Sequence, residues 1–82
     1  MAQVTRENIR SQFRGTLLFV NTPEQPEVFF GRFIRTNLVR NDNQDFLYVT
    51  VEVTDAATLE VGKQVVFDID RAIVFNDDKE QG

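Results

Sequence analysis

The sequence predicts a mainly β domain: a small, partly open, five-stranded antiparallel barrel preceded by a short N-terminal helix. Between residues 15 and 75 the chain contains several short runs of β-branched and aromatic residues, separated by turn-forming residues. One of these runs, 46–53, alternates strictly between apolar and other residues, which is typical of a half-buried antiparallel strand. At 82 residues, the chain is long enough for one domain.

The N-terminal helix is expected over about residues 5–13. Thr5 can cap its first turn, and Val4 can pack on Ile9 as a hydrophobic staple. Ile9 and Phe13 would then lie on one side of the helix. Because a helix this short needs tertiary support, we expect these two side chains to plug one end of the barrel.

The first two strands are expected at residues 16–20 and 28–36. The loop between them contains Pro23 and Pro26, which remove hydrogen-bond donors and favour extended neighbours. In the second strand, strict alternation would place Arg32 on the same face as apolar residues, so we expect a bulge at Gly31 that re-aims the later residues of the strand. In a strand without the bulge, one face would carry Phe29, Gly31, Phe33 and Arg35, and the other would carry Val28, Phe30, Arg32 and Ile34.

The remaining elements are predicted from turn residues and alternation. A polar turn at 40–45 precedes the third strand, and a connection at 54–62, with helical tendency at 55–59, leads to a fourth strand at 64–69. A tight turn then returns the chain over 72–75, and 77–82 is expected to be a disordered, charged tail after a domain spanning 1–76. The expected core residues are Leu17, Val49, Val51, Val65, Phe67 and Ile69.

The charge is unevenly distributed along the chain. Residues 1–40 carry six arginines and three glutamates, a net charge of +3, whereas residues 41–82 carry three basic and ten acidic residues, a net charge of −7. The acidic total argues against a protein that wraps duplex DNA through bulk electrostatics. A fold can still bring the arginines together on one surface, and the alternative is that they are scattered and solvated.

The composition argues against catalysis. The chain has no cysteine, histidine or tryptophan and a single serine, so most nucleophiles, general bases and soft-metal ligands are missing. Asp68 and Asp70 share a strand face, but carboxylates there more simply protect a solvated edge. We expect a binding module without catalytic residues, cofactor or metal site. No apolar stretch has the length of a membrane span and the N-terminus lacks the apolar core of a signal peptide, so we also expect a cytoplasmic protein with no membrane partner.

Four pieces of the chain occur in an order that resembles the cold-shock domains. They are the runs 15–21, 30–34, 45–49 and 59–69, so the resemblance covers about residues 15–75. It implies a small barrel of the oligonucleotide-binding class, related in shape to SH3-like barrels. The sequence departs from the family pattern at Phe19, which stands at a tryptophan position, and at Arg32, which stands at a glycine position.

This resemblance implies binding of single-stranded RNA or DNA by stacking of bases on an aromatic face. Exposed rings offer a π-face to any base, which is physically sufficient for such binding. Tyr48 lies outward by alternation in the third strand, whereas any one phenylalanine could instead belong to the core. The candidate nucleic-acid-binding residues are Phe19, Phe29, Phe33, Arg35, Phe46 and Tyr48.

Two alternatives remain open at the level of the sequence. The acidic second half favours a small protein-interaction or regulatory module, in which the same aromatic face docks a protein partner or a second copy of the chain. The N-terminal helix, Gly31 in a bent second strand and Asn37 after it are also similar to the Sm-like fold, which would imply a ring-forming oligomer.

Overall fold

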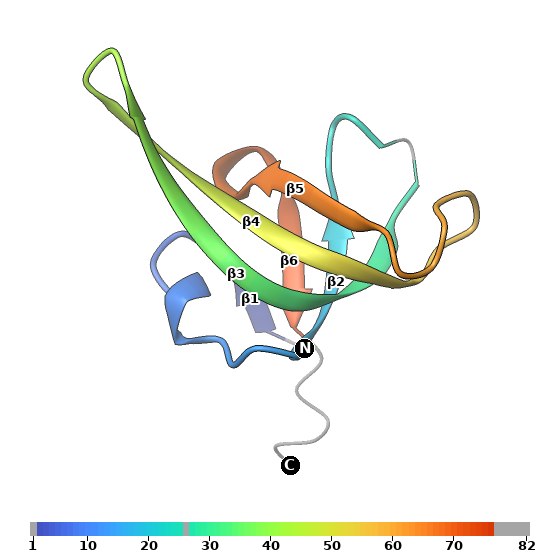
Figure 1. The fold of residues 1–82 in the computed structure, drawn as a ribbon. Helices are drawn as coiled ribbons and strands as arrows, with labels where there is room; N and C mark the ends of the chain where they lie inside the picture. Colours follow the sequence, from blue (N-terminus) through green and yellow to red (C-terminus); the bar gives the residue numbers. More distant parts are fainter. Residues whose placement is uncertain (1, 26, 77–82) are drawn as a thin grey trace.

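The structure, a computed structural model, describes residues 2–25 and 27–76. The tail expected at 77–82 lies outside these residues. The described chain forms one antiparallel sheet that curves around a single core (Figure 1). Its strands are β1 (Ala2–Val4), β2 (Leu17–Asn21), β3 (Phe29–Asn41), β4 (Gln44–Asp55), β5 (Gln64–Asp68) and β6 (Ile73–Asn76).

The strand order across the sheet is β1-β6-β2-β3-β4-β5. The mainly β, antiparallel prediction is confirmed, but closure is not. β1 and β5 occupy the two edges and do not pair with each other, so the sheet is open, and it contains one strand more than expected. The extra strand, β1, is three residues long and pairs with β6, which buries Val4 in the core.

The predicted N-terminal helix is wrong: the described residues contain no α-helix. Residues 5–13 instead form turns around one 3₁₀ turn, η1 (Ile9–Ser11). Thr5 does not cap a helix; its N–H donates to the side-chain oxygen of Asn8 at 2.8 Å. Ile9 is fully buried as expected, but Phe13 is 81% exposed and does not plug the sheet. With only one apolar anchor, this segment gains too little burial to support a helix.

The first strand has the opposite phase to the one expected. Leu18 and Val20 are fully buried, and Leu17, which was expected in the core, lies between core and surface on the other face of β2. Because side chains alternate along a strand, choosing the wrong member of the Leu17–Leu18 pair changes the face of the whole strand.

β3 contains two irregularities in its pairing with β4. The register shifts between Phe30 and Gly31, where the extra residue is Thr54 of β4, and again between Phe33 and Arg35, where the extra residue is Ile34 of β3. The expected bulge of β3 at Gly31 is therefore wrong: β3 alternates without a break from Phe29 to Phe33, because the face that carries Phe30 and Arg32 is the outer one. Between the two shifts, Gly31 and Phe33 face the core and Arg32 faces solvent. The second shift turns Arg35 away from the face that Phe33 occupies, because a bulge moves the residues after it to the opposite face.

β4 confirms the expected alternation: Leu47, Val49, Val51 and Val53 are all buried. The hairpin before it is longer than expected and closes through Asp42 and Asn43, both with positive φ (51° and 63°). Two such residues are characteristic of the tight turns whose twist matches that of paired strands. At the other end of β4, no helix forms at residues 55–59: the strand continues to Asp55, and residues 57–59 form bends.

The last elements keep the expected order. β5 packs Phe67 into the core, with Val65 partly buried beside it, and the short 3₁₀ turn η2 (Ile69–Arg71) buries Ile69 before β6 begins.

Arg6 connects the beginning of the chain to its last elements. Its guanidinium donates to the Asp70 carboxylate at 2.9 Å and to the backbone oxygen of Asp45 at 2.8 Å.

A second link joins the loops at the opposite end of the sheet. One Glu27 carboxylate oxygen accepts from the backbone N–H of Thr58 at 2.8 Å and from its hydroxyl at 2.6 Å. These hydrogen bonds favour the charged carboxylate, so the Thr58 hydroxyl first, and then the Thr58 N–H, lower the pKa of Glu27.

None of the helices in the described part of the chain has the length and apolar character to cross a membrane.

We expect Gly31→Ala to destabilise the fold. A Cβ at this position would lie 2.9 Å from Val51 Cγ2 and 3.2 Å from the Glu52 backbone oxygen, so β3 or β4 would have to move. Such overpacking costs about 1–3 kcal/mol. Urea denaturation measures the loss, and Arg32→Ala, one residue away but exposed, is the control. Equal midpoints for Gly31→Ala and the wild type would contradict the close approach.

We expect the Glu27–Thr58 link to contribute stability at neutral pH that disappears in acid. Because folding lowers the pKa of Glu27, this contribution is present above the pKa of the unfolded chain and is lost as pH falls through the lower folded value. Denaturation midpoints of the wild type and Thr58→Val, measured across the acidic range, should therefore converge as pH falls. A constant difference between them would show that the carboxylate charge is not involved.

Candidate binding surfaces

The outer face of the sheet is the face turned away from the core, and it carries most of the sequence-predicted site residues that are accessible. Side chains on it lie between buried residues along each strand, since successive residues point to opposite faces. Two aromatic clusters lie on this face, one where β6, β2 and β3 are neighbours and one where β4 meets β5.

The first cluster is a row of three phenylalanines, here called the ring row: Phe75, Phe19 and Phe30. Phe19 on β2 lies directly opposite Phe75 on β6 and Phe30 on β3. All three are partly exposed, and each lies next to buried neighbours on its own strand. The Phe19 and Phe30 rings meet edge to face, with centroids 5.0 Å apart. The ring row therefore spans three adjacent strands, with a direct ring contact between Phe19 and Phe30 and with Phe75 at the position paired with Phe19.

Three arginines lie near one end of the ring row. Arg32 comes two residues after Phe30 on β3 and is paired with Leu17. Arg14 precedes Gly15, whose N–H donates to the Phe33 backbone oxygen at 2.7 Å, so Arg14 lies beside the stretch of β3 that leads to Arg35.

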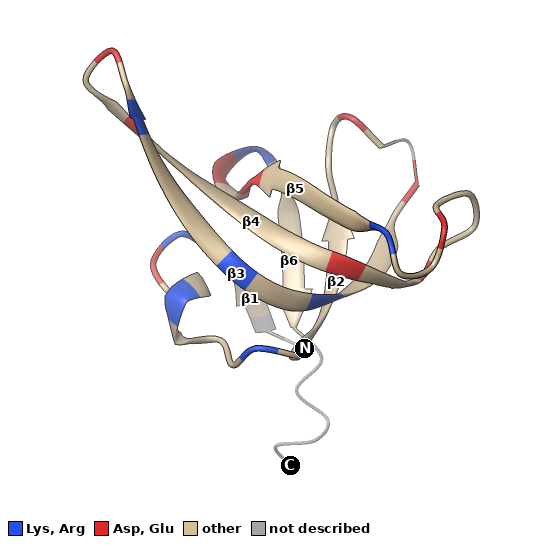
Figure 2. Cartoon of the chain, in the orientation of Figure 1, with Lys and Arg blue, Asp and Glu red and all other residues tan. Residues whose placement is uncertain are grey.

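None of Arg14, Arg32 and Arg35 forms an ion pair with a residue that the structure describes, whereas Arg6, Arg40 and Arg71 each approach a carboxylate within 4.0 Å. Figure 2 shows most of the basic residues on the N-terminal segment and β3, and the acidic ones spread over several loops and turns and on β4.

The second cluster, here called the acidic aromatic patch, consists of Phe46, Tyr48, Val66 and Asp68. The Phe46 and Tyr48 rings are stacked, with centroids 6.5 Å apart and planes at 28°. Tyr48 lies opposite Asp68 on β5. A cavity of about 300 Å³ adjoins the patch and is also lined by Glu24, Phe67 and Arg71. This surface combines ring faces with carboxylates.

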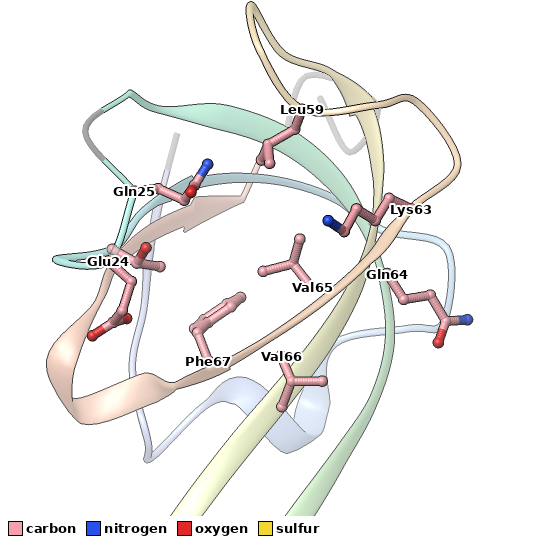
Figure 3. A pocket seen from close by; sticks show the side chains of 9 residues that line it. Glu24, Gln25, Leu59, Lys63, Gln64, Val65, Val66 and Phe67 are labelled. Atoms are coloured by element: carbon pink, nitrogen blue, oxygen red, sulfur yellow. The ribbon is translucent and has the colours of Figure 1, made fainter.

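A further cavity of about 250 Å³ lies along the inner side of β5. Val65 and Phe67 point into it from the strand, and Leu59 and Gln25 point into it from the facing loops (Figure 3). It separates β5 from the loop that follows β2, of which Thr22, Glu24 and Gln25 line the cavity.

The structure divides the sequence-predicted binding residues among four environments. Phe29 and Phe33 lie in the core, with 1% and 6% of their surface exposed, and offer no ring face to a ligand. Phe19 belongs to the ring row. Phe46 and Tyr48 form the acidic aromatic patch, and Arg35 is exposed on β3, opposite Thr50.

Sequence reasoning did not single out Phe30 and Phe75 as site residues. The signal for both was alternation: each sits between residues that the structure buries, Phe29 and Gly31 for one, and Val74 and Asn76 for the other. The pairing of β6 with β2, which places Phe75 beside Phe19, joins segments more than 50 residues apart and leaves no local signal in the sequence.

Comparison of the chain with family models, with curated proteins and with solved structures finds no match.

We expect truncation of the two classes of phenylalanine to have different costs. Phe29→Ala removes a fully buried ring and should lower the free energy of unfolding by about 3–5 kcal/mol. Phe46→Ala removes a partly exposed ring and should cost much less. Denaturant unfolding monitored by circular dichroism compares the two. A similar loss in both variants would mean that the core and outer faces of β3 and β4 are not separated as described.

Proposed function

We propose that this protein is a non-catalytic module that binds single-stranded nucleic acid on the outer face of its sheet. The observation that carries the proposal is the ring row beside three arginines that have no ion-pair partner among the described residues. Proteins that bind single strands without strong sequence preference combine aromatic stacking surfaces with a basic track for the backbone. The resemblance of residues 15–75 to cold-shock domains points in the same direction.

The rings supply the base contacts. Phe75, Phe19 and Phe30 stand on three adjacent strands, and neighbouring strands lie about 4.8 Å apart. A single strand of nucleic acid that crosses the sheet at this point meets the rings in succession. Stacking of a base on an aromatic side chain contributes about 1–3 kcal/mol per base.

The charges indicate which side of the ring row faces the phosphates. Glu52 lies opposite Arg32, and Asp55 lies opposite Phe30, so the β4 side of the row is acidic. Arg14 lies on the side of the N-terminal segment, and Arg32, on β3, lies between Leu17 of β2 and Glu52 of β4. We therefore place the nucleic-acid backbone along the N-terminal segment, away from β4.

Loss of one ring face tests the proposal. We expect Phe30→Leu, which keeps an apolar side chain but removes the ring, to weaken binding of a fluorescent oligothymidine or oligouridine by about 1 kcal/mol or more. Phe46→Leu is the matched control, because it removes a ring of the same kind outside the ring row. Fluorescence anisotropy at low salt measures both affinities, and circular dichroism verifies folding.

Two results would overturn the proposal. One is the absence of any oligonucleotide binding at low salt by the folded wild type. The other is a weaker affinity for the oligonucleotide in Phe46→Leu together with an unchanged affinity in Phe30→Leu. The salt dependence gives an independent check, since three phosphate contacts predict a slope of log K against log salt of about −2, reduced by about 0.7 in Arg32→Gln.

A second function is favoured by a separate observation. The acidic aromatic patch would repel phosphates, but its rings and carboxylates suit a protein partner. This is the protein-interaction alternative of the sequence analysis, moved to a different surface from the ring row. Self-association as in the Sm-like alternative would have to use β1 or β5, the strands at the two edges of the described sheet.

A further inference from the structure

β5 is an open edge of the sheet. It pairs with β4 on one side, and among the described residues no backbone group pairs with it on the other. Edge strands that avoid pairing usually carry charges, prolines or bulges. β5 has no proline and no register shift with β4, and its one charged residue, Asp68, stands at its last position. An exposed valine, Val66, lies at its centre, with 61% of its surface accessible. The centre of the strand is therefore little protected against pairing with another chain.

The pairing pattern identifies the backbone groups at this edge. Phe33 directs both its N–H and its C=O toward β2, so its β4 partner Val51 directs its own groups toward β5. Val51 is paired with Val65. By alternation, the residues of β5 that turn their N–H and C=O to the open edge are Gln64, Val66 and Asp68.

Two cavities accompany this edge, one on each face of the strand. The inner cavity is lined by Leu59, Val65 and Phe67 and also by polar and charged side chains, among them Gln25 and Lys63. The outer cavity is bounded by the Phe46 and Tyr48 rings together with two carboxylates and Arg71. A strand added to β5 would send alternate side chains to the two faces, one set toward the apolar part of the inner cavity and the other toward the rings.

The charges at the outer cavity favour a cation. Asp68 forms no ion pair with a described residue; its side chain accepts only from the N–H of Asp70, at 3.0 Å. Glu24 approaches Arg71 at 4.0 Å, and both of these side chains are mostly exposed, so this pair neutralises the site weakly. A cationic side chain over the Phe46 or Tyr48 ring would gain from the ring face and from Asp68 together.

We propose that the edge of β5 binds an extended, basic segment of a partner protein as an added strand. Main-chain hydrogen bonds form to Gln64, Val66 and Asp68. An apolar side chain of the segment enters the inner cavity, and an arginine or lysine lies against Phe46 and Tyr48 beside Asp68. This site is separate from the ring row and does not depend on nucleic-acid binding there.

The test is an amide-resolved NMR titration of the full chain with a short, end-capped peptide of alternating arginine and valine. We expect the largest shifts at residues 64–68 and slower exchange of the Val66 amide. Two control peptides isolate the causes: one with glutamate in place of arginine, and one N-methylated at alternate residues so that it cannot form a ladder. Both should bind at least about tenfold more weakly, a difference of about 1.4 kcal/mol, because one repels Asp68 and the other lacks backbone donors for the ladder.

Variants of the protein give a second measurement. Val66→Pro removes a donor at the open edge without breaking the β4 ladder, a place where proline is tolerated in a sheet. We expect it to abolish peptide binding, whereas Val66→Thr, which keeps the backbone donor, should not. Phe46→Leu should lower the affinity for the basic peptide by about 2–5-fold. If Val66→Pro does not fold, the N-methylated peptide still tests the ladder.

Several outcomes would overturn the proposal. These are equal binding of the acidic and basic peptides, equal binding of the N-methylated peptide, or shifts confined to the ring row. Shifts at residues 64–68 caused by an oligonucleotide alone would assign this edge to nucleic acid. A concentration-dependent dimer mass by light scattering that Val66→Pro abolishes, without peptide binding, would assign it to a second copy of the chain.

Discussion

The close approach of β3 to β4 at Gly31 is the constraint on which the rest of the structure depends. No Cβ stands between Gly31 and Val51, so the two longest strands can approach and bend together there. The bulge at Ile34, a few residues on, bends β3 again. A flat pair of strands would leave the core exposed on one side. The bent pair curves the sheet over it and brings β2, β5 and β6 around the same interior (Figure 1).

The same two irregularities decide which side chains reach the surface. Before the bulge, Phe29 and Phe33 fill the core; after it, Arg35 is exposed, although it is only two residues beyond Phe33. The outer face therefore receives arginines in the middle of β3, whereas the acidic aromatic patch lies on β4 and β5. Core packing and surface chemistry are in this way determined by one short segment of one strand.

The elements with a strong local pattern could be predicted from the sequence. β4 and the core residues Val49, Val51 and Phe67 are predicted by alternation alone, whereas the bulge expected in β3 at Gly31 is replaced by an extra residue in β4, Thr54, which the pattern of β3 could not indicate. The parts that failed depend on contacts between distant segments. β1 forms only because β6 offers it an edge, and the N-terminal helix fails because Phe13 has no partner to pack on among the described residues. The ring row depends on the pairing of β6 with β2. The face that β2 turns to the core could not be predicted, because either Leu17 or Leu18 could be the buried residue.

The separation of charge on this small molecule also affects how it meets other molecules. Arginines without an ion-pair partner in the described chain lie near the ring row, on the N-terminal segment and β3 (Figure 2), whereas Asp68 and Glu24 lie at the acidic aromatic patch. At physiological ionic strength the field of such groups extends about 8 Å from the surface, enough to orient an approaching partner before contact. A polyanion and a basic chain would therefore be steered to different parts of the sheet, the polyanion to the ring row and the basic chain to the edge of β5. The rates at which they associate would both fall as salt rises, and neither would have to leave for the other to arrive.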